Sequence, residues 1–581
     1  MPDPYRVLTC PTPVVGPLRV ATATGLISID ALVRRARAEG RTAEWAAASL
    51  GGALAEQRAV EQLLVRRGTD RDALGREAFA DEVRTFAADA ESTVRAQLDA
   101  LGIAMPERAG RTGSTTSASA ARTAFVRLYE QGLLHLEHGV APECPRCRTV
   151  VDRLDCEPVE LEDELLTARF PYKDGEGVLE LTLAAPELLA GAVAVAVPDG
   201  HEGVGRKVHL PVGDVTVPVV VDQRRRRPRP VVPAHLPDDF ELSRRVGLVP
   251  VEVVDGEGVV RTSGPLDGMS RYAARAAARD LLAGAGILGP SRPIGVSERR
   301  CLRCGTLVVA RLGQRWTLDF RALAEPVAEL VRSGMLRFSD QVARDRFLDR
   351  AGRSETWCLS HQVWTGQQVP VAHCADCGQV AVAVDPGDSC SKCMGPLLGD
   401  GDVLDARFVG ALWPLVSAGW PGDPGAAAAV APWTTLFVDG PAVTAWALPM
   451  AALGLCLSGA VPFATVAVHP LHGLSELDPS PPVDLDALLA NGQATARLAL
   501  AWATVGGGVP DRERADRLLA ALADPPAGDA DLDAVDDAFN ASFDAGAPAD
   551  ALTPLEAALA GGVTRGQAER LRALAMPLTG G

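Results

Sequence analysis

Four CxxC motifs constrain the fold of this chain more than any other feature of its sequence. They contain eight of the 12 cysteines and lie at Cys144/Cys147, Cys301/Cys304, Cys374/Cys377 and Cys390/Cys393. Only 12 residues separate the last two motifs, and a glycine stands close behind each of them, Gly378 and Gly395. Two such turns bring four thiolates to one tetrahedral Zn²⁺, and a filled shell of this kind is structural. A disulfide or unpaired buried cysteines are the alternatives, and the spacing favours zinc.

The first two motifs are separated by about 150 residues. They can share a second zinc only if the chain between them, residues 152–298, is an inserted domain whose ends meet. Short β-type runs bounded by Gly, Pro or Asp fill this stretch: VLELTLA, AVAVAVP, KVHLPV and VTVPVVV. We therefore expect a β-rich insert and two structural zinc sites. A basic run in the insert, Arg224–Arg229, is either a solvated loop or a patch that contacts phosphates.

Charge and hydropathy narrow the classes of function. The net charge of −17 opposes a nucleic-acid ligand, because affinity for phosphates comes largely from Lys and Arg. Lysine occurs only at Lys173, Lys207 and Lys392, which, with abundant Ala, Gly, Pro and Val, indicates a high-GC bacterial genome. We find no unbroken apolar run long enough to span a membrane and no signal peptide. Because CxxC pairs in such a chain favour metal over disulfides, we expect a cytoplasmic protein.

Apolar periodicity predicts an alternation of strands and helices, and hence an α/β fold. Strands are expected at Tyr5–Cys10 and Pro462–Val468. Helices are expected at Ser28–Glu39, Glu44–Gln62, Leu74–Leu101, Ala121–Leu134, Phe320–Met335 and Ala442–Leu455. The small polar stretch Arg108–Ser119 reads as a flexible loop, and the Ala-rich, acidic chain from Asp484 onward reads as helical.

Seven collinear segments carry a resemblance to the valyl-tRNA synthetases, a family of class I aminoacyl-tRNA synthetases. They are DALVRRARAEG, LGREAFADEV, AFVRLYEQGLL with CPRC, AHLPDDFELSRRVGL, CLRCGTLV with AEPV, WCLSHQVWTGQQVPV and DVLDARFVGALWP. The resemblance implies a class I Rossmann-type core split by an inserted β-rich, editing-like domain, with zinc-binding modules and a short helical C-terminal domain. The implied parts are residues 1–143 and 305–483 for the core, 144–304 for the insert and 484–581 for the C-terminal domain, with the second zinc module at 374–393.

The resemblance also shows where the family's activation chemistry should lie. The family activates valine with ATP, and its HIGH signature falls on Arg19, Val20, Ala21 and Thr22, where neither histidine is present. The preceding loop is Cys10–Gly16, with Pro13 in place of the family's asparagine. The aspartate that holds the substrate ammonium aligns with Leu50. The KMSKS signature should follow His469, but no lysine occurs after Lys392.

The editing and anticodon-binding elements depart from the family in the same way. The family's TTRPET segment corresponds to Leu183–Leu188, which lacks both threonines and the arginine, and the aspartate of its HDPND run appears as Leu236. Only about 90 residues follow Gly492, fewer than the family's anticodon-binding domain needs. We therefore assign no catalytic residue, expect no ATP bound in the family's way, and consider tRNA an unlikely partner.

Three hypotheses follow. The first is a pseudoenzyme that binds or regulates a protein partner or a small ligand. The second is a repurposed enzyme of amino-acid or acyl-adenylate chemistry in specialised metabolism, and the third is a divergent valine–tRNA ligase. Trp357 and Trp364 either line the former amino-acid pocket or pack in the core. Cys10 is either a nucleophile or a buried, incidental thiol.

Overall fold

The computed structural model describes residues 4–52, 54–103, 108–151, 155–353, 356–422, 433–469, 482–503, 510–524, 526, 528, 530–545 and 547–580. The chain divides into two compact units. Unit 1 comprises Met1–Leu134, Leu318–Trp357 and Trp364–Gly581, and unit 2 comprises His135–Thr317 and Cys358–Val363. Unit 2 contains the whole of the expected insert, residues 144–304, and both of its flanking CxxC motifs.

Unit 1 is built on a six-stranded sheet in the order β14-β22-β21-β1-β2-β3. Its strands are β1 (Tyr5–Thr9), β2 (Ala43–Ser49), β3 (Arg108–Arg111), β14 (Arg337–Phe338), β21 (Trp433–Asp439) and β22 (Phe463–His469). All neighbouring strands pair in parallel. The chain order of the strands reverses between β1 and β21, and in such sheets ligands bind at this switch point, outside the carboxyl ends of the strands.

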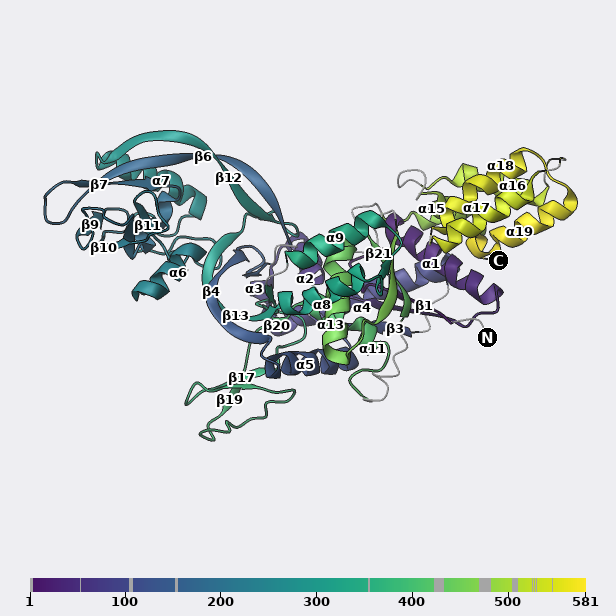
Figure 1. The fold of residues 1–581 in the computed structure, drawn as a ribbon, viewed down its shortest axis with the longest axis horizontal. Helices are drawn as coiled ribbons and strands as arrows, with labels where there is room; N and C mark the ends of the chain where they lie inside the picture. The colour runs from purple at the N-terminus through teal and green to yellow at the C-terminus, as the bar shows by residue number, and fades with distance from the viewer. Residues whose placement is uncertain are drawn as a thin grey trace. The chain divides into compact units, whose positions relative to one another are not determined.

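Helices surround this sheet in the doubly wound manner of a Rossmann-type core (Figure 1). They are α1 (Val20–Ala38), α2 (Leu54–Arg66), α3 (Arg71–Leu74), α4 (Arg76–Ala100), α5 (Thr115–Glu130), α8 (Phe320–Arg332), α9 (Gln341–Gly352), α10 (Ala406–Ala411), α11 (Trp413–Val416), a π-helical turn (Val443–Ala447) and α13 (Leu448–Ser458). A small sheet, β18-β17-β19, also belongs to unit 1, with bounds Val380–Val382, Val371–Cys374 and Leu397–Gly399. None of the helices placed by the structure is long and apolar enough to cross a bilayer.

The C-terminal helices pack against α1 and share one hydrophobic core with it (Figure 1, yellow and purple). They are α14 (Leu485–Leu489), α15 (Gln493–Ala503), α16 (Arg512–Ala523), α17 (Leu532–Asp544), α18 (Leu552–Ala560) and α19 (Arg565–Thr579). A buried ion pair joins α15 to α1: an Nη atom of Arg497 lies 2.6 Å from the Asp30 carboxylate, and the two side chains are 0% and 1% exposed. The helical C-terminal region is thus fused to the core of unit 1.

Unit 2 is β-rich, as the sequence predicted. The runs VLELTLA, AVAVAVP, KVHLPV and VTVPVVV form β7 (Val178–Leu183), β8 (Ala194–Val197), β9 (Lys207–Leu210) and β10 (Val215–Val221). With β11 (Arg229–Val231), the last three form the sheet β11-β8-β10-β9, whereas β7 pairs with the long β6 (Cys156–Pro171). Helices α6 (Pro237–Val246) and α7 (Arg271–Gly284) complete the module.

A long antiparallel pair leads into and out of this module. β6 and β12 (Leu288–Cys301) run side by side from Cys156/Cys301 to Ala168/Leu288, and form an extended arch in Figure 1. Near the arch lie β4 (Leu134–Cys144), β5 (Thr149–Val150) and β13 (Val309–Asp319), which belong to one further sheet. The β6–β12 pairing brings two points of the chain that are far apart in sequence to the same place.

Two stretches were assigned the wrong kind of structure from the sequence. Glu44–Gln62 was expected to be one helix, but its first part is strand β2 and only Leu54 onward is helical. The run AEWAAAS has helix-forming alanines, yet it pairs with β1 and β3, so tertiary pairing overrides local propensity. Arg108–Ser119 was expected to be a flexible loop, but it supplies β3 and the first turns of α5, which Ser114 caps by accepting from the Ser117 N–H.

Candidate metal centres and the carboxyl edge of the parallel sheet

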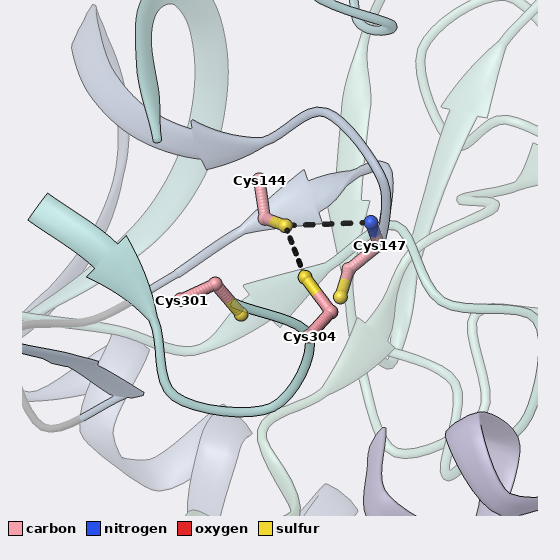
Figure 2. A group of neighbouring side chains, drawn as sticks. All are labelled: Cys144, Cys147, Cys301 and Cys304. Atoms are coloured by element: carbon pink, nitrogen blue, oxygen red, sulfur yellow. Dashed lines mark hydrogen bonds between the residues drawn. The ribbon is translucent and has the colours of Figure 1, made fainter. Parts of the chain in front are cut away.

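The first cysteine quartet gathers side chains from two distant parts of unit 2 (Figure 2). Cys144 ends β4 and Cys147 lies in the turn before β5, whereas Cys301 ends β12 and Cys304 lies in the turn that follows it. The four Sγ atoms lie within 4.8 Å of one another, and those of Cys144 and Cys304 are 3.4 Å apart. Only Cys304 is not fully buried. The structure therefore brings the two motifs together across the insert.

The second quartet lies in unit 1 and is assembled from neighbouring turns. Cys374 ends β17 and Cys377 follows in its turn, while Cys390 and Cys393 precede β19. The Sγ atoms of Cys374 and Cys393 are 3.4 Å apart, and those of Cys377 and Cys390 are 3.8 Å apart. Cys377 and Cys393 are exposed to solvent. This group is local in sequence and open on one side.

All four motifs share one turn geometry. The residue after the second cysteine has a positive φ, of 55° at Arg148, 71° at Gly305, 68° at Gly378 and 62° at Met394. Its backbone N–H donates to the carbonyl oxygen of the first cysteine over 2.7 to 3.0 Å. The left-handed position behind the last motif is therefore Met394, one residue before the glycine singled out in the sequence. This turn directs both thiols of a motif to the same side.

The donor sets fit zinc. In a tetrahedral site with Zn–S bonds of about 2.3 Å, neighbouring sulfurs are about 3.8 Å apart. Three of the sulfur–sulfur distances, 3.4 to 3.8 Å, are close to this spacing, and all four sulfurs of each group lie within 4.8 Å of one another. Thiolates without carboxylate ligands favour zinc over magnesium or calcium. Both groups can hold a metal ion, and among the residues that the structure describes no further cluster of metal-ligating side chains is found.

Trp357 and Trp364 pack against protein side chains in unit 1. Trp357 is 6% exposed, its Nε1 donates to the Asp405 carboxylate over 3.3 Å, and it meets Phe320 and Phe408 edge to face. Trp364 meets Phe79 in the same way, at 5.7 Å between ring centroids. These contacts fit the core-packing alternative. A pocket-lining role for either tryptophan stays a prediction.

The switch point of the sheet is lined by Cys10, which follows β1, and Asp439, which ends β21. Cys10 is 2% exposed. Burial raises the pKa of the Cys10 thiol well above its usual range, and the negative charge of Asp439 raises it further. A thiol held neutral in this way is a poor nucleophile. The geometry therefore favours the buried-thiol alternative for Cys10.

The position expected to hold a substrate ammonium is apolar. Leu50 directly follows β2, is fully buried, and donates its N–H to the carbonyl oxygen of Thr12 over 2.9 Å. It packs beside Gly410, where an added Cβ would lie 3.1 Å from Leu50 Cδ1 and 2.6 Å from the Trp446 ring. This corner of the carboxyl edge is filled by hydrocarbon.

The first-signature positions lie at the start of α1. Arg19 is the N-cap residue, and Val20, Ala21 and Thr22 form the first turn. The counterpart of the second signature, residues 470–481, lies outside the described residues. The strand that leads to it, β22, ends at His469, whose Nε2 lies 3.4 Å from the Ser28 hydroxyl.

In the insert, the editing-like positions are occupied by packing residues. Leu183 and Leu188 are 1% and 2% exposed, and Leu236 is the N-cap residue of α6 and packs against the same core. The neighbouring His235 has both ring nitrogens bonded: Nδ1 lies 2.9 Å from the Ala310 carbonyl oxygen, and Nε2 accepts from the Val253 N–H over 3.1 Å. Burial lowers the pKa of His235 to about 4, so the ring is neutral at pH 7.

The basic run of the insert is divided in two. Arg225 lies 3.0 Å from Asp222 and 3.3 Å from Asp239, and Arg229 also pairs with Asp239. Asp239 is fully buried and accepts from the Val232 N–H, so these arginines fix the loop to α6. Arg224, Arg226 and Arg227 are exposed. The solvated-loop interpretation thus describes only part of the run.

One buried carboxyl group was not anticipated from the sequence. Glu56 lies in the first turn of α2, is 2% exposed, and accepts from the Gly52 N–H over 2.9 Å. Arg111 lies 3.5 Å away. Burial raises the pKa of Glu56 to about 7. The run LAEQRAVEQLL reads as an ordinary amphipathic helix, so no sequence signal distinguishes this glutamate from its exposed neighbours.

Comparison with known families decides what this architecture is. A family model described as tRNA synthetases class I (I, L, M and V) matches residues 2–474. The chain belongs to the class I tRNA synthetases. This agrees with the parallel six-stranded sheet, the β-rich insert and the two cysteine quartets.

Individual class I synthetases show the same relation. The valine–tRNA ligase of Carboxydothermus hydrogenoformans is 31% identical over 481 residues, which cover 81% of this chain and 55% of that protein. That of Streptomyces coelicolor is 32% identical over 478 residues, or 80% of this chain and 54% of that protein. The valine–tRNA ligase of Thermus thermophilus is 31% identical over 487 residues, which cover 81% of this chain and 56% of that protein. The chain spans about half the length of these curated relatives.

Solved structures of synthetases share the fold at low sequence identity. A LeuRS of Agrobacterium radiobacter, in a ternary complex with tRNA and LeuAMS, has a TM-score of 0.53 at 16% identity, covering 100% of this chain and 84% of that one. The methionyl-tRNA synthetase of Mycobacterium tuberculosis bound by methionyl-adenylate has a TM-score of 0.52 at 14% identity, covering 99% and 92%. At these identities the likeness shows the fold alone.

Proposed function

We propose that this chain is a non-catalytic, valyl-type member of the class I tRNA synthetases that acts as a binding or regulatory protein. Leu50 is the observation that carries the proposal. It occupies the place where the resemblance puts the ammonium-binding aspartate, and it is fully buried among hydrocarbon. An ammonium group placed there would lose its water without gaining a carboxylate partner, a cost that buried, unpaired charges do not repay.

Three further features support the proposal. Arg19 and Thr22 stand where the first signature has histidines, and no lysine follows Lys392 to neutralise a triphosphate. Cys10, at the switch point, is buried and its thiol is held neutral, so it does not supply a substitute nucleophile. The elements that the chain retains are structural ones, above all the two cysteine quartets. Because their eight thiols require a reducing compartment, the proposal includes a cytoplasmic location. It also includes structural zinc at both quartets.

Amino-acid-dependent ATP–pyrophosphate exchange tests the proposal directly. The full chain, with its metals, is expected to show no exchange above background with valine or with any other proteinogenic amino acid. The matched control is a valine–tRNA ligase assayed in parallel. Valine-dependent exchange by this chain would refute the proposal and establish the divergent ligase.

A repurposed enzyme is the second candidate, and one observation favours it. The sheet keeps its switch point between β1 and β21, the place where α/β proteins bind ligands. A thermal-shift screen of nucleotides, amino acids and acyl-adenylate analogues tests this candidate, because a ligand that binds only the folded state raises the Tm. A concentration-dependent shift that Leu50→Arg abolishes would favour it. A screen without any shift would leave the binding of a protein partner as the proposed activity.

A further inference from the structure

A fifth cysteine lies directly beside the buried quartet. Cys156 begins β6 and is the register partner of Cys301, the quartet residue that ends β12. It is half-buried, whereas Cys301 is fully buried. Cys156 belongs to neither of the two cysteine quartets.

The hydrogen-bond pattern defines the kind of pair that Cys156 and Cys301 form. The N–H of Leu302 donates to the carbonyl oxygen of Asp155 over 2.9 Å, so Asp155 and Leu302 are a hydrogen-bonded pair. In an antiparallel ladder the two kinds of pair alternate, which makes Cys156/Cys301 a non-hydrogen-bonded pair. The Cα atoms of such pairs are about 4.5 Å apart and their side chains project on the same face.

This backbone geometry permits a covalent link. Disulfides span Cα separations of about 4.4 to 6.8 Å, so a Cys156–Cys301 bond needs rotation of the two side chains but no movement of the strands. Rotation of Cys301 toward Cys156 takes its sulfur away from Cys144, Cys147 and Cys304. Three thiolates would then remain at a site that zinc fills with four.

We infer that Cys156 and Cys301 form a thiol pair that oxidises to a disulfide and releases the metal ion of the buried quartet. The oxidant is a hydroperoxide. The Cys156 thiolate attacks the peroxide, the O–O bond breaks, and Cys156 becomes a sulfenic acid while hydroxide leaves. The Cys301 thiolate then attacks the sulfenic sulfur, the S–S bond forms, the S–O bond breaks, and a second hydroxide leaves. Overall two thiols and one H₂O₂ give one disulfide and two waters.

The half-buried position of Cys156 sets the order of events. Cys144, Cys147 and Cys301 are shielded from solvent, and the half-buried Cys304 is one of the four ligands, whereas Cys156 is half-buried and lies outside the ligand set. Oxidation therefore begins at Cys156, and the Cys301 thiolate then displaces hydroxide from its sulfenic sulfur. A thiol reductant reverses the disulfide and added zinc refills the site. The pair therefore makes metal binding at the start of the insert depend on the redox state. The inference does not depend on whether the chain activates an amino acid.

The test uses the zinc-loaded full chain treated with one equivalent of hydrogen peroxide, with released zinc followed by a coloured chelator. Non-reducing peptide mapping with differential alkylation identifies the oxidised cysteines, which separates the buried quartet from the exposed one. The wild-type chain is expected to yield a peptide that joins Cys156 to Cys301 and to lose the metal of the first quartet. Dithiothreitol with zinc is expected to restore it.

Cys156→Ser is expected to slow metal loss from the first quartet by about ten-fold or more, because the accessible thiol that starts the exchange is gone. Cys456→Ser, which removes another half-buried thiol, in α13 of unit 1 and outside both ligand sets, serves as the matched control and should behave as wild type. Cys156→Ala replaces the serine variant if that fails to fold. Unchanged metal loss in the Cys156 variant, or disulfides formed only among the four quartet cysteines, would overturn the inference.

Discussion

The two units join distant parts of the chain by different means. In unit 2, residues separated by more than 150 positions meet at a quartet of thiols, to which both distant parts of the chain contribute a fully buried cysteine, Cys144 and Cys301. In unit 1, the distant partners Asp30 and Arg497 meet as a buried ion pair within a shared apolar core, while the cysteine quartet of this unit closes only a short ribbon. The two quartets therefore have different structural roles. The same CxxC turn joins distant segments of the chain in unit 2 and neighbouring turns of one short ribbon in unit 1.

Removal of one ligand from each quartet should give the largest effects and separate the two roles. Closing a loop of the length between Cys144 and Cys301 is worth about 5 kcal/mol, and closing one of the length between Cys374 and Cys390 about 3 kcal/mol. We expect Cys301→Ser to destabilise unit 2 by the larger amount and Cys390→Ser to disorder only its ribbon. Urea unfolding and limited proteolysis measure the difference, with zinc content falling from two to one in each case. Equal losses would show that loop length does not distinguish the sites.

Loss of the buried ion pair should be the next largest effect. Arg497→Ala removes the buried partner of Asp30 but leaves Arg34, whose Nε lies 2.8 Å from the same carboxylate. The loss should therefore fall at or below the lower end of the roughly 3–5 kcal/mol that breaking a buried pair costs. Urea unfolding of unit 1 should show this loss, and Arg497→Met should recover part of it because hydrocarbon fills the space. Arg517→Ala in the neighbouring α16 is the matched control, since its side chain is 66% exposed and should change stability little. A neutral Arg497→Ala would mean that the apolar core alone joins the helices to α1.

Acid should weaken unit 2 through His235. The pKa of His235 is about 4 in the folded chain against an ordinary value of 6.5, so the unfolded state binds the extra proton between these pH values. The stability is complete above pH 6.5 and is lost as the pH falls toward 4, by up to about 3 kcal/mol. The metal sites also lose affinity in acid, so the measurement is the difference in unfolding free energy between wild type and His235→Gln. This difference should shrink between pH 7 and 5; a constant difference would contradict the assignment.

The smallest expected effect on stability comes from the CxxC turns, in which the residue after the second cysteine has a positive φ. Met394 and Arg148 hold positive φ angles of 62° and 55°, a conformation that costs a side-chain-bearing residue about 1 kcal/mol. Met394→Gly and Arg148→Gly should each stabilise their quartet by about that amount, and Gly378→Ala and Gly305→Ala should destabilise theirs similarly. Thermal unfolding with zinc present measures all four. If the glycine variants gained nothing, contacts of the original side chains would have to offset the strain.

The sequence carried much of this architecture in local patterns. The CxxC spacing located both quartets, and β-branched runs located β7 to β10, because both signals lie within a few residues. Strand β2 was missed because AEWAAAS has no β-type pattern and becomes a strand only between β1 and β3. The start of α1 was placed too late, since Val20–Ile27 is buried on nearly all sides and shows no helical period. Glu56, Asp30 and Cys156 could not be found, because each depends on a partner that only the fold supplies.

The arch formed by β6 and β12 has a consequence for the history of such chains. β6 begins and β12 ends beside the buried quartet, so the chain enters and leaves the insert at two adjacent backbone points. A gene could gain, exchange or discard that insert by splicing at these two points, leaving the host sheet undisturbed. The module can thus vary in sequence while its attachment stays intact.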